Sequence, residues 1–280
     1  HFDQSYRVRT GNATAGLDVK LPGDFKASVY GTFNWSRNDT FQPGINTTAL
    51  AAAAAGTTAA TALDPFGTGT SPAVVAAILD NPTDFTNHQR TRIGAVKVDG
   101  PLADLPGGAI KVALGAEYRR ETYDQRGSSG GVGFPEDLKR SVQSLYGELF
   151  VPIVGEGNAS PMLRSLTLSL SGRYDHYSDF GSTTNPKVGL TWEPVEGLNF
   201  RGSYGRSFRA PGLRDLGSTV GSYYAAAALV DAFGARDPSR GATQVNTILL
   251  YGGNQALKPE KARTFSFGVD LRPRFAPDFS

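Results

Sequence analysis

The chain has 280 residues and a formal net charge of +2, and only 19% of its residues are charged, which argues against disorder and against a general nucleic-acid-binding protein with a strongly basic face. It contains no cysteine, so a disulfide scaffold and a cysteine-ligated metal site are excluded, whereas its 34 glycines suit a β protein with many turns. No stretch approaches the ~18 consecutive apolar residues of a transmembrane helix, and the first residues lack the features of a signal peptide, so we expect a mature chain or a fragment.

Alternation of apolar and polar residues is the dominant pattern and predicts about nine β-strands. In 25–38, for example, Phe25, Val29 and Phe33 share one face, and Lys26 lies on the other. These strands are longer than the 5–6 residues usual in globular proteins. In chain order they are predicted at 6–20, 25–38, 88–100, 109–125, 140–154, 164–179, 184–194, 198–209 and 261–274.

The connections between these strands are of two kinds. Short ones rich in Pro and Gly occur at 21–24, 103–108, 155–163 and 195–197. Longer ones are predicted at 39–87, 126–139 and 210–260. Apart from the short 180–183, the two kinds alternate along the chain. This is typical of a membrane β-barrel with short periplasmic turns and longer external loops. A large soluble barrel or β-sandwich is the alternative.

Aromatic spacing supports the membrane interpretation. Phe25 and Trp35 lie on one face of their strand, and at a tilt of about 40° they are separated vertically by roughly 20–25 Å, close to the height of a barrel's apolar band. In the first long connection, Ser71 can cap a short helix that has Pro72 at its first position. A second short helix is predicted within 222–239 of the last connection.

Catalytic and metal-binding patterns are weak. The three histidines, His1, His88 and His176, show no metal-ligand spacing. Asp175 and His176 lie beside serines, but the alternation around them favours a histidine ring at a membrane rim over a catalytic triad. We therefore expect no enzyme activity, catalytic residue, metal site or cofactor.

Charged residues fall on the polar faces of several predicted strands. In a barrel embedded in lipid they must point into the lumen, because an arginine at the lipid midplane costs about 2–4 kcal/mol. A lumen with charges of both signs suits a hydrated pore and also a protein plug held by ion pairs. The candidates for lumen-facing or plug-contact residues are Lys111, Glu117, Arg119, Glu148, Arg173, Asp175, Arg201 and Arg209. By contrast, Arg206 and Phe208 share the lipid-facing register, near the outer rim.

Several motifs resemble the TonB-dependent outer-membrane receptor family. They are "VALGAEYRRETYD" (112–124), "YGELFVPIV" (146–154), the stretch 168–216 containing "NPKVGLTW" and "RGSYGRSFRAP", and "LKPEKARTFSFGVDLRP" (257–273). "ALDPFG" (62–67) is also similar to segments of larger members. Each motif is moderately specific, and their order along the chain strengthens the resemblance.

The resemblance implies an all-β fold, an antiparallel barrel of 22 strands with a plugged lumen, in the bacterial outer membrane. It implies active uptake of a scarce ligand such as a metal–siderophore, a cobalamin or an oligosaccharide, driven through the inner-membrane TonB complex. Its partners would then be that complex, a plug domain, outer-membrane lipid and the ligand, with no nucleic acid. We expect 1–280 to be part of one barrel domain, with the plug domain and the terminal barrel strands not present in this chain.

In this interpretation the external loops 39–87 and 210–260 capture the ligand. The loop candidates for ligand contact are Asp64, Phe66, Tyr223, Tyr224, Phe233 and Arg236. A passive porin-like diffusion channel is an alternative function for the same architecture. A soluble β-rich glycan-binding module or glycan-acting enzyme is a further alternative.

Overall fold

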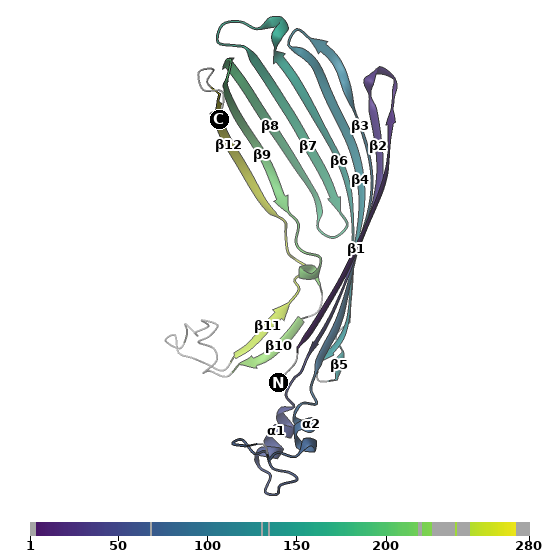
Figure 1. The fold of residues 1–280 in the computed structure, drawn as a ribbon, viewed down its shortest axis with the longest axis vertical. Coiled ribbons are helices and arrows are strands. Elements are labelled where there is room, and N and C mark those ends of the chain that lie inside the picture. The colour runs from purple at the N-terminus through teal and green to yellow at the C-terminus, as the bar shows by residue number, and fades with distance from the viewer. Residues whose placement is uncertain are drawn as a thin grey trace.

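The computed structural model describes residues 4–67, 69–129, 131–133, 135–217, 220–225, 239 and 247–272. Nine long strands of this described part form one open, twisted and curved antiparallel sheet (Figure 1). In sheet order they are β1 (Ser5–Lys20), β2 (Lys26–Gln42), β3 (Thr83–Leu105), β4 (Gly108–Ser129), β6 (Glu136–Val154), β7 (Ser165–Tyr177), β8 (Gly181–Val195), β9 (Leu198–Arg209) and β12 (Glu260–Leu271). All nine predicted strands are confirmed.

Two kinds of connection lie at opposite ends of the sheet. At one end are short turns, which include the 3-10 turns η1 (Pro22–Asp24) and η2 (Glu156–Asn158). At the other end, lowest in Figure 1, are two long segments. The first carries α1 (Thr47–Ala54) and α2 (Pro72–Ile78), and the second carries η3 (Arg214–Leu216) and the hairpin of β10 (Val220–Ala225) and β11 (Thr247–Gly252). We call this the long-loop end.

The predicted helix at Ser71 is confirmed, because the Ser71 side chain accepts a hydrogen bond from the Val74 amide and Pro72 begins α2. Helix α1 has an equivalent cap in Asn46, whose side chain accepts from the Ala49 amide at 3.0 Å. This helix was not predicted, because its alanine-rich residues carry no amphipathic pattern. Among the described residues, no helix is long and apolar enough to span a membrane.

One expectation about the connections was wrong. The stretch 126–139 is mostly strand, because β4 continues to Ser129 in register with β3 and β6 begins at Glu136. The short strand β5 (Val132–Gly133) pairs with β4 between them. The glycines and serines there indicated a loop, but the backbone pairing extends across them. Of the helix predicted within 222–239, residues 222–225 belong to β10, and 226–238 lies outside the described residues.

The two faces of the sheet differ in chemistry. The face that carries Val29, Val96, Leu114, Leu145 and Val188, which we call the apolar face, exposes large hydrophobic side chains: Leu145 is 62% exposed. The opposite face, which we call the polar face, holds most of the buried polar residues of the nine strands. These include Thr40, Asn87, Gln125, Arg140, Ser144, Asp175 and Thr183. A sheet with hydrophobic side chains facing outward and polar side chains packed together is the inverse of a soluble fold, and is typical of a barrel wall in lipid.

Candidate functional site

Three neighbouring strands and the turn after the third bring seven charged residues together on the polar face. Glu117, Arg119 and Glu121 alternate along β4 and share one face because strand side chains repeat with a period of two. Register then places Arg140 of β6 opposite Glu121, and Asp175 of β7 opposite Ser144 of β6. We call the following set the charged network: Glu117, Arg119, Glu121, Arg140, Arg173, Asp175 and Asp179.

Arg173 organises one half of the charged network. Its Nε lies 2.8 Å from Oδ1 of Asp175, and its Nη2 lies 3.2 Å from Oε1 of Glu117. The Asp175 side chain is only 3% exposed, and it also accepts a hydrogen bond of 2.6 Å from the Ser144 hydroxyl. A buried carboxylate is costly without partners. These contacts with Arg173 and Ser144 provide them.

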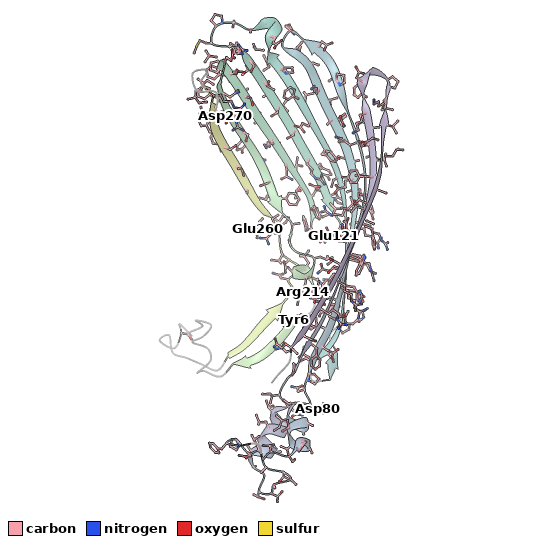
Figure 2. All side chains as sticks on the ribbon, viewed as in Figure 1. Tyr6, Asp80, Glu121, Arg214, Glu260 and Asp270 are labelled. Carbon is pink, nitrogen blue, oxygen red and sulfur yellow. The ribbon has the colours of Figure 1, made fainter. Side chains whose placement is uncertain are left out.

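Arg119 and Arg140 extend the charged network toward the long-loop end. Arg119 Nε lies 2.9 Å from Oε1 of Glu121, and Arg140 Nη2 lies 2.6 Å from Oε2 of the same carboxylate. Arg140 Nη1 also donates to the Pro211 carbonyl at 2.9 Å, at the start of the long segment that follows β9. Figure 2 shows Glu121 near the middle of the sheet, and Arg214 on this long segment. The charged network therefore anchors the segment to the sheet.

An aromatic cluster adjoins Arg140. The guanidinium carbon of Arg140 lies 5.4 Å from the ring centroid of Tyr177, which stacks on Phe180 at 4.4 Å. Phe208 packs edge-on against Tyr177 at 5.8 Å. The lipid-facing assignment of Phe208 was wrong, because its ring packs against Tyr177, whose hydroxyl accepts a hydrogen bond from Arg119 on the polar face.

The charges of this network are nearly balanced, with three arginines and four carboxylates in mutual contact. Such a set can hold a polar protein surface across an interface or line a hydrated space. The part of the chain that the structure describes holds no group of three or more His, Asp or Glu side chains suited to a metal ion.

The eight predicted lumen-facing residues do not form one group. Glu117, Arg119, Arg173 and Asp175 lie in the charged network. Lys111 and Glu148 instead line a groove of about 440 Å³ nearer the short turns. Arg201 forms two contacts of 2.8 Å with Asp270, and Arg209 lies 4.0 Å from Glu260 in solvent.

The loop candidates lie at the long-loop end. Asp64 accepts hydrogen bonds from the amides of Phe66 and Gly69, which shapes its own loop, whereas the Phe66 side chain is 99% exposed. In the β10–β11 hairpin, Tyr223 is paired with Leu249 and Tyr224 with Ile248. Phe233 and Arg236 lie outside the described residues.

Three residues of this site were not predicted from the sequence: Arg140, Asp179 and Tyr177. Arg140 shares its register with Glu148 on the same predicted strand, so alternation alone could have placed it on the polar face. Asp179 lies in the turn between β7 and β8, where no periodic pattern exists to indicate its direction.

Comparison with known proteins identifies relatives of the whole chain and of its parts. The family model "TonB dependent receptor-like, beta-barrel" matches residues 2–279. A heme/hemopexin utilization protein C of Haemophilus influenzae (strain Rd) is 25% identical over 174 residues, which are 58% of this chain and 21% of that relative. Its counterpart in strain 86-028NP is 29% identical over 107 residues, 36% of this chain and 12% of that relative.

Two solved structures have a similar fold. The siderophore receptor PirA of Acinetobacter baumannii aligns with a TM-score of 0.62 and 13% identity, over 96% of this chain and 33% of that one. The RagAB peptide transporter aligns with a TM-score of 0.54 and 13% identity, over 96% of this chain and 28% of that one. The chain thus spans about a third or less of the length of each of these proteins.

Proposed function

The chain belongs to the TonB-dependent receptor-like β-barrel family and forms wall of an outer-membrane barrel, and on that premise we propose that the complete protein performs TonB-dependent active uptake of a scarce ligand. The observation that carries the proposal is the joint presence of the family match over residues 2–279 and a polar face built of ion pairs. A barrel interior of this kind suits a plug that moves when the receptor is energised.

We further propose that residues 1–280 are one continuous part of a barrel domain of about 22 strands. The plug domain and the remaining strands would lie elsewhere in a longer protein. The exposed flank of the charged network, formed by Arg173 with its side chain 36% exposed, would contact the plug. Since Arg173 already bridges Glu117 and Asp175, a plug carboxylate could exchange with either partner.

Ligand capture is assigned to the two long segments, which lie at the same end of the sheet (Figure 1). Phe66 supports this assignment because a fully exposed aromatic ring at a loop tip is available for stacking on a ligand. Asp64 would act indirectly, by holding the backbone that presents Phe66.

The first ligands to test are iron-containing. Two of the relatives are named for heme and hemopexin utilization, and one structural neighbour is a siderophore receptor. Cobalamin and oligosaccharides belong in the same panel, and the peptide transporter among the neighbours adds peptides. A passive channel is disfavoured by the family match, and it predicts uptake that does not depend on energy.

A deletion strain and a complemented strain, each with and without an intact TonB complex, would be compared for growth on limiting ferric siderophores, haem, cobalamin, oligosaccharides or peptides. The expected result is one ligand class whose uptake requires both the receptor and the TonB complex. Uptake that requires the receptor but persists without the TonB complex would instead establish the passive channel. If no ligand separated the deletion strain from the complemented one, the proposed uptake would be wrong.

A further inference from the structure

On the apolar face of three strands, an arginine lies two positions from an aromatic residue. On each strand the cation is the one nearer the long-loop end. The pairs are Tyr118 and Arg120 on β4, Tyr204 and Arg206 on β9, and Phe265 and Arg263 on β12. Aromatic side chains mark the boundary between the apolar band and the headgroups of a membrane barrel. The cations therefore lie at the level of the headgroups.

Strand register places two pairs of arginines directly opposite each other on the apolar face. Arg92 of β3 is the cross-strand partner of Arg120, and Arg206 is the partner of Arg263. Like charges directly opposite each other destabilise a sheet. Neither Arg92 nor Arg120 forms an ion pair with a carboxylate of the described residues, and the only charge-related contact of Arg92 there is with the Phe33 ring, at 5.8 Å. This pair lacks a counterion from the sheet itself.

Another arginine on the apolar face, Arg126, does have carboxylate partners. Arg126, further toward the long-loop end of β4, lies 3.1 Å from Asp124 and 3.0 Å from Asp137. Its charge is already balanced by the protein. The lack of carboxylates around Arg92 and Arg120 is therefore a local property and not a general feature of this face.

An apolar groove lies next to the Arg92–Arg120 pair, on the side away from the long-loop end. Its volume is about 670 Å³. Its lining includes Gly94, two residues from Arg92 on β3, and Ala116 on the neighbouring strand β4. The larger side chains of Tyr118, Leu145 and Tyr174 also line the groove. A hydrophobic groove directly below two unpaired cations matches a lipid, which joins an acyl chain to a charged headgroup.

We propose that Arg92 and Arg120 bind a phosphate group of an outer-leaflet lipid, one of whose acyl chains lies in this groove. The anion is a phosphate because the planar guanidinium groups of arginine donate paired hydrogen bonds that fit phosphate oxygens. Its source is a lipid and not free phosphate because the groove begins two residues from each arginine, at Gly94 and Tyr118, and lies within the apolar band. The phosphate would supply the counterion that the sheet lacks.

The test uses the complete receptor purified from outer membranes and stripped of bound lipid in detergent. Binding of diphosphorylated lipid A, of its fully dephosphorylated form and of inorganic phosphate would be measured by native mass spectrometry. The diphosphorylated lipid should bind most tightly. The double variant Arg92→Gln/Arg120→Gln should weaken its binding about 30-fold, about fivefold per arginine. Arg126→Gln, the matched control, should change binding less than twofold because its charge is already neutralised.

The comparison of the three probes on the unmodified receptor needs no variant, so it decides the proposal even if the double variant fails to assemble. Equal binding of the phosphorylated and dephosphorylated lipids would overturn the phosphate contact. Inorganic phosphate binding as tightly as the lipid would overturn the lipid as the source. Arg92→Lys/Arg120→Lys should assemble normally and recover part of the affinity, because it keeps the charge but loses the paired hydrogen bonds.

Discussion

Arg140 and Glu121 stand directly opposite each other on β6 and β4, and the Nη2 atom of Arg140 lies 2.6 Å from Oε2 of Glu121. The Arg140 side chain is only 8% exposed, and it also reaches Asp179 and the Pro211 carbonyl. One guanidinium therefore ties two strands, a turn and the start of a long segment together. Its removal takes a donor from Glu121, Asp179 and the Pro211 carbonyl at once.

Arg140→Met is accordingly expected to destabilise the folded barrel by about 1–3 kcal/mol, because three acceptors lose a charged donor and Glu121 keeps only its ion pair with Arg119. Urea unfolding of the complete receptor in detergent, followed by tryptophan fluorescence, measures this change. The double variant Arg140→Met/Glu121→Gln should recover part of the loss. Arg209→Gln is the control, since Arg209 is 82% exposed at its side chain and should have no measurable effect. An Arg140 variant as stable as the control would contradict the role assigned to it.

The assignment of the two faces can be tested on adjacent residues of β7. Leu170 lies on the apolar face, and Ser171 lies on the polar face between Glu148 and Lys187. Leu170→Arg should cost about 2–4 kcal/mol and reduce the assembled fraction, because the arginine faces lipid. Ser171→Arg should assemble normally, with Glu148 opposite the new charge.

Assembly would be measured by the heat-dependent mobility shift of the receptor in outer-membrane fractions. Arg206→Leu should also be mild, because Arg206 lies beyond the aromatic Tyr204 at the rim. If Leu170→Arg and Ser171→Arg assembled equally well, the faces would be assigned wrongly.

Gly197 in the turn between β8 and β9 is expected to resist substitution. Its φ of +84° is unfavourable for other residues, and a Cβ atom there would lie 2.3 Å from the Arg272 carbonyl oxygen. Gly197→Ala should therefore destabilise the barrel by more than about 1 kcal/mol. Gly202→Ala is the matched control, because nothing lies within 4 Å of its added Cβ, and it should be neutral or stabilising by about 0.5–1 kcal/mol. Equal unfolding midpoints in urea for the two variants would rule out the strain argument.

Substitutions of Phe66 and Asp64 can distinguish a residue that contacts the ligand from one that maintains the loop structure. Phe66→Ala should leave stability unchanged, because the ring is fully exposed, and should lower ligand affinity by about 1–2 kcal/mol if the ring stacks on the ligand. Asp64→Ala should loosen the loop and weaken affinity less specifically. Binding to cells at several ligand concentrations distinguishes the two. Unchanged affinity in Phe66→Ala would remove Phe66 from the proposed ligand site.

The strands of the sheet were predictable because their alternation is long and regular. The strand predicted at 25–38 is β2, and its continuation to Gln42 was missed only because the apolar pattern fades beyond Trp35. The stretch 126–139 was misinterpreted because glycine and serine favour loops locally, whereas strand pairing with β3 extends across them. The pairing of β10 with β11 could not be predicted, since the two strands are separated by 21 residues and neither shows a long apolar–polar alternation.

The amino-acid sequence by itself determined which side chains share a face, since alternation with a period of two places Glu117, Arg119 and Glu121 together on any strand. Only the tertiary structure decided their partners. A shift of two residues between β4 and β6 would keep every side chain on its own face, yet it would place Glu121 opposite Leu138 or Val142 in place of Arg140. The same reasoning applies on the apolar face, where register alone brings Arg92 opposite Arg120 and leaves that pair without a counterion from the sheet.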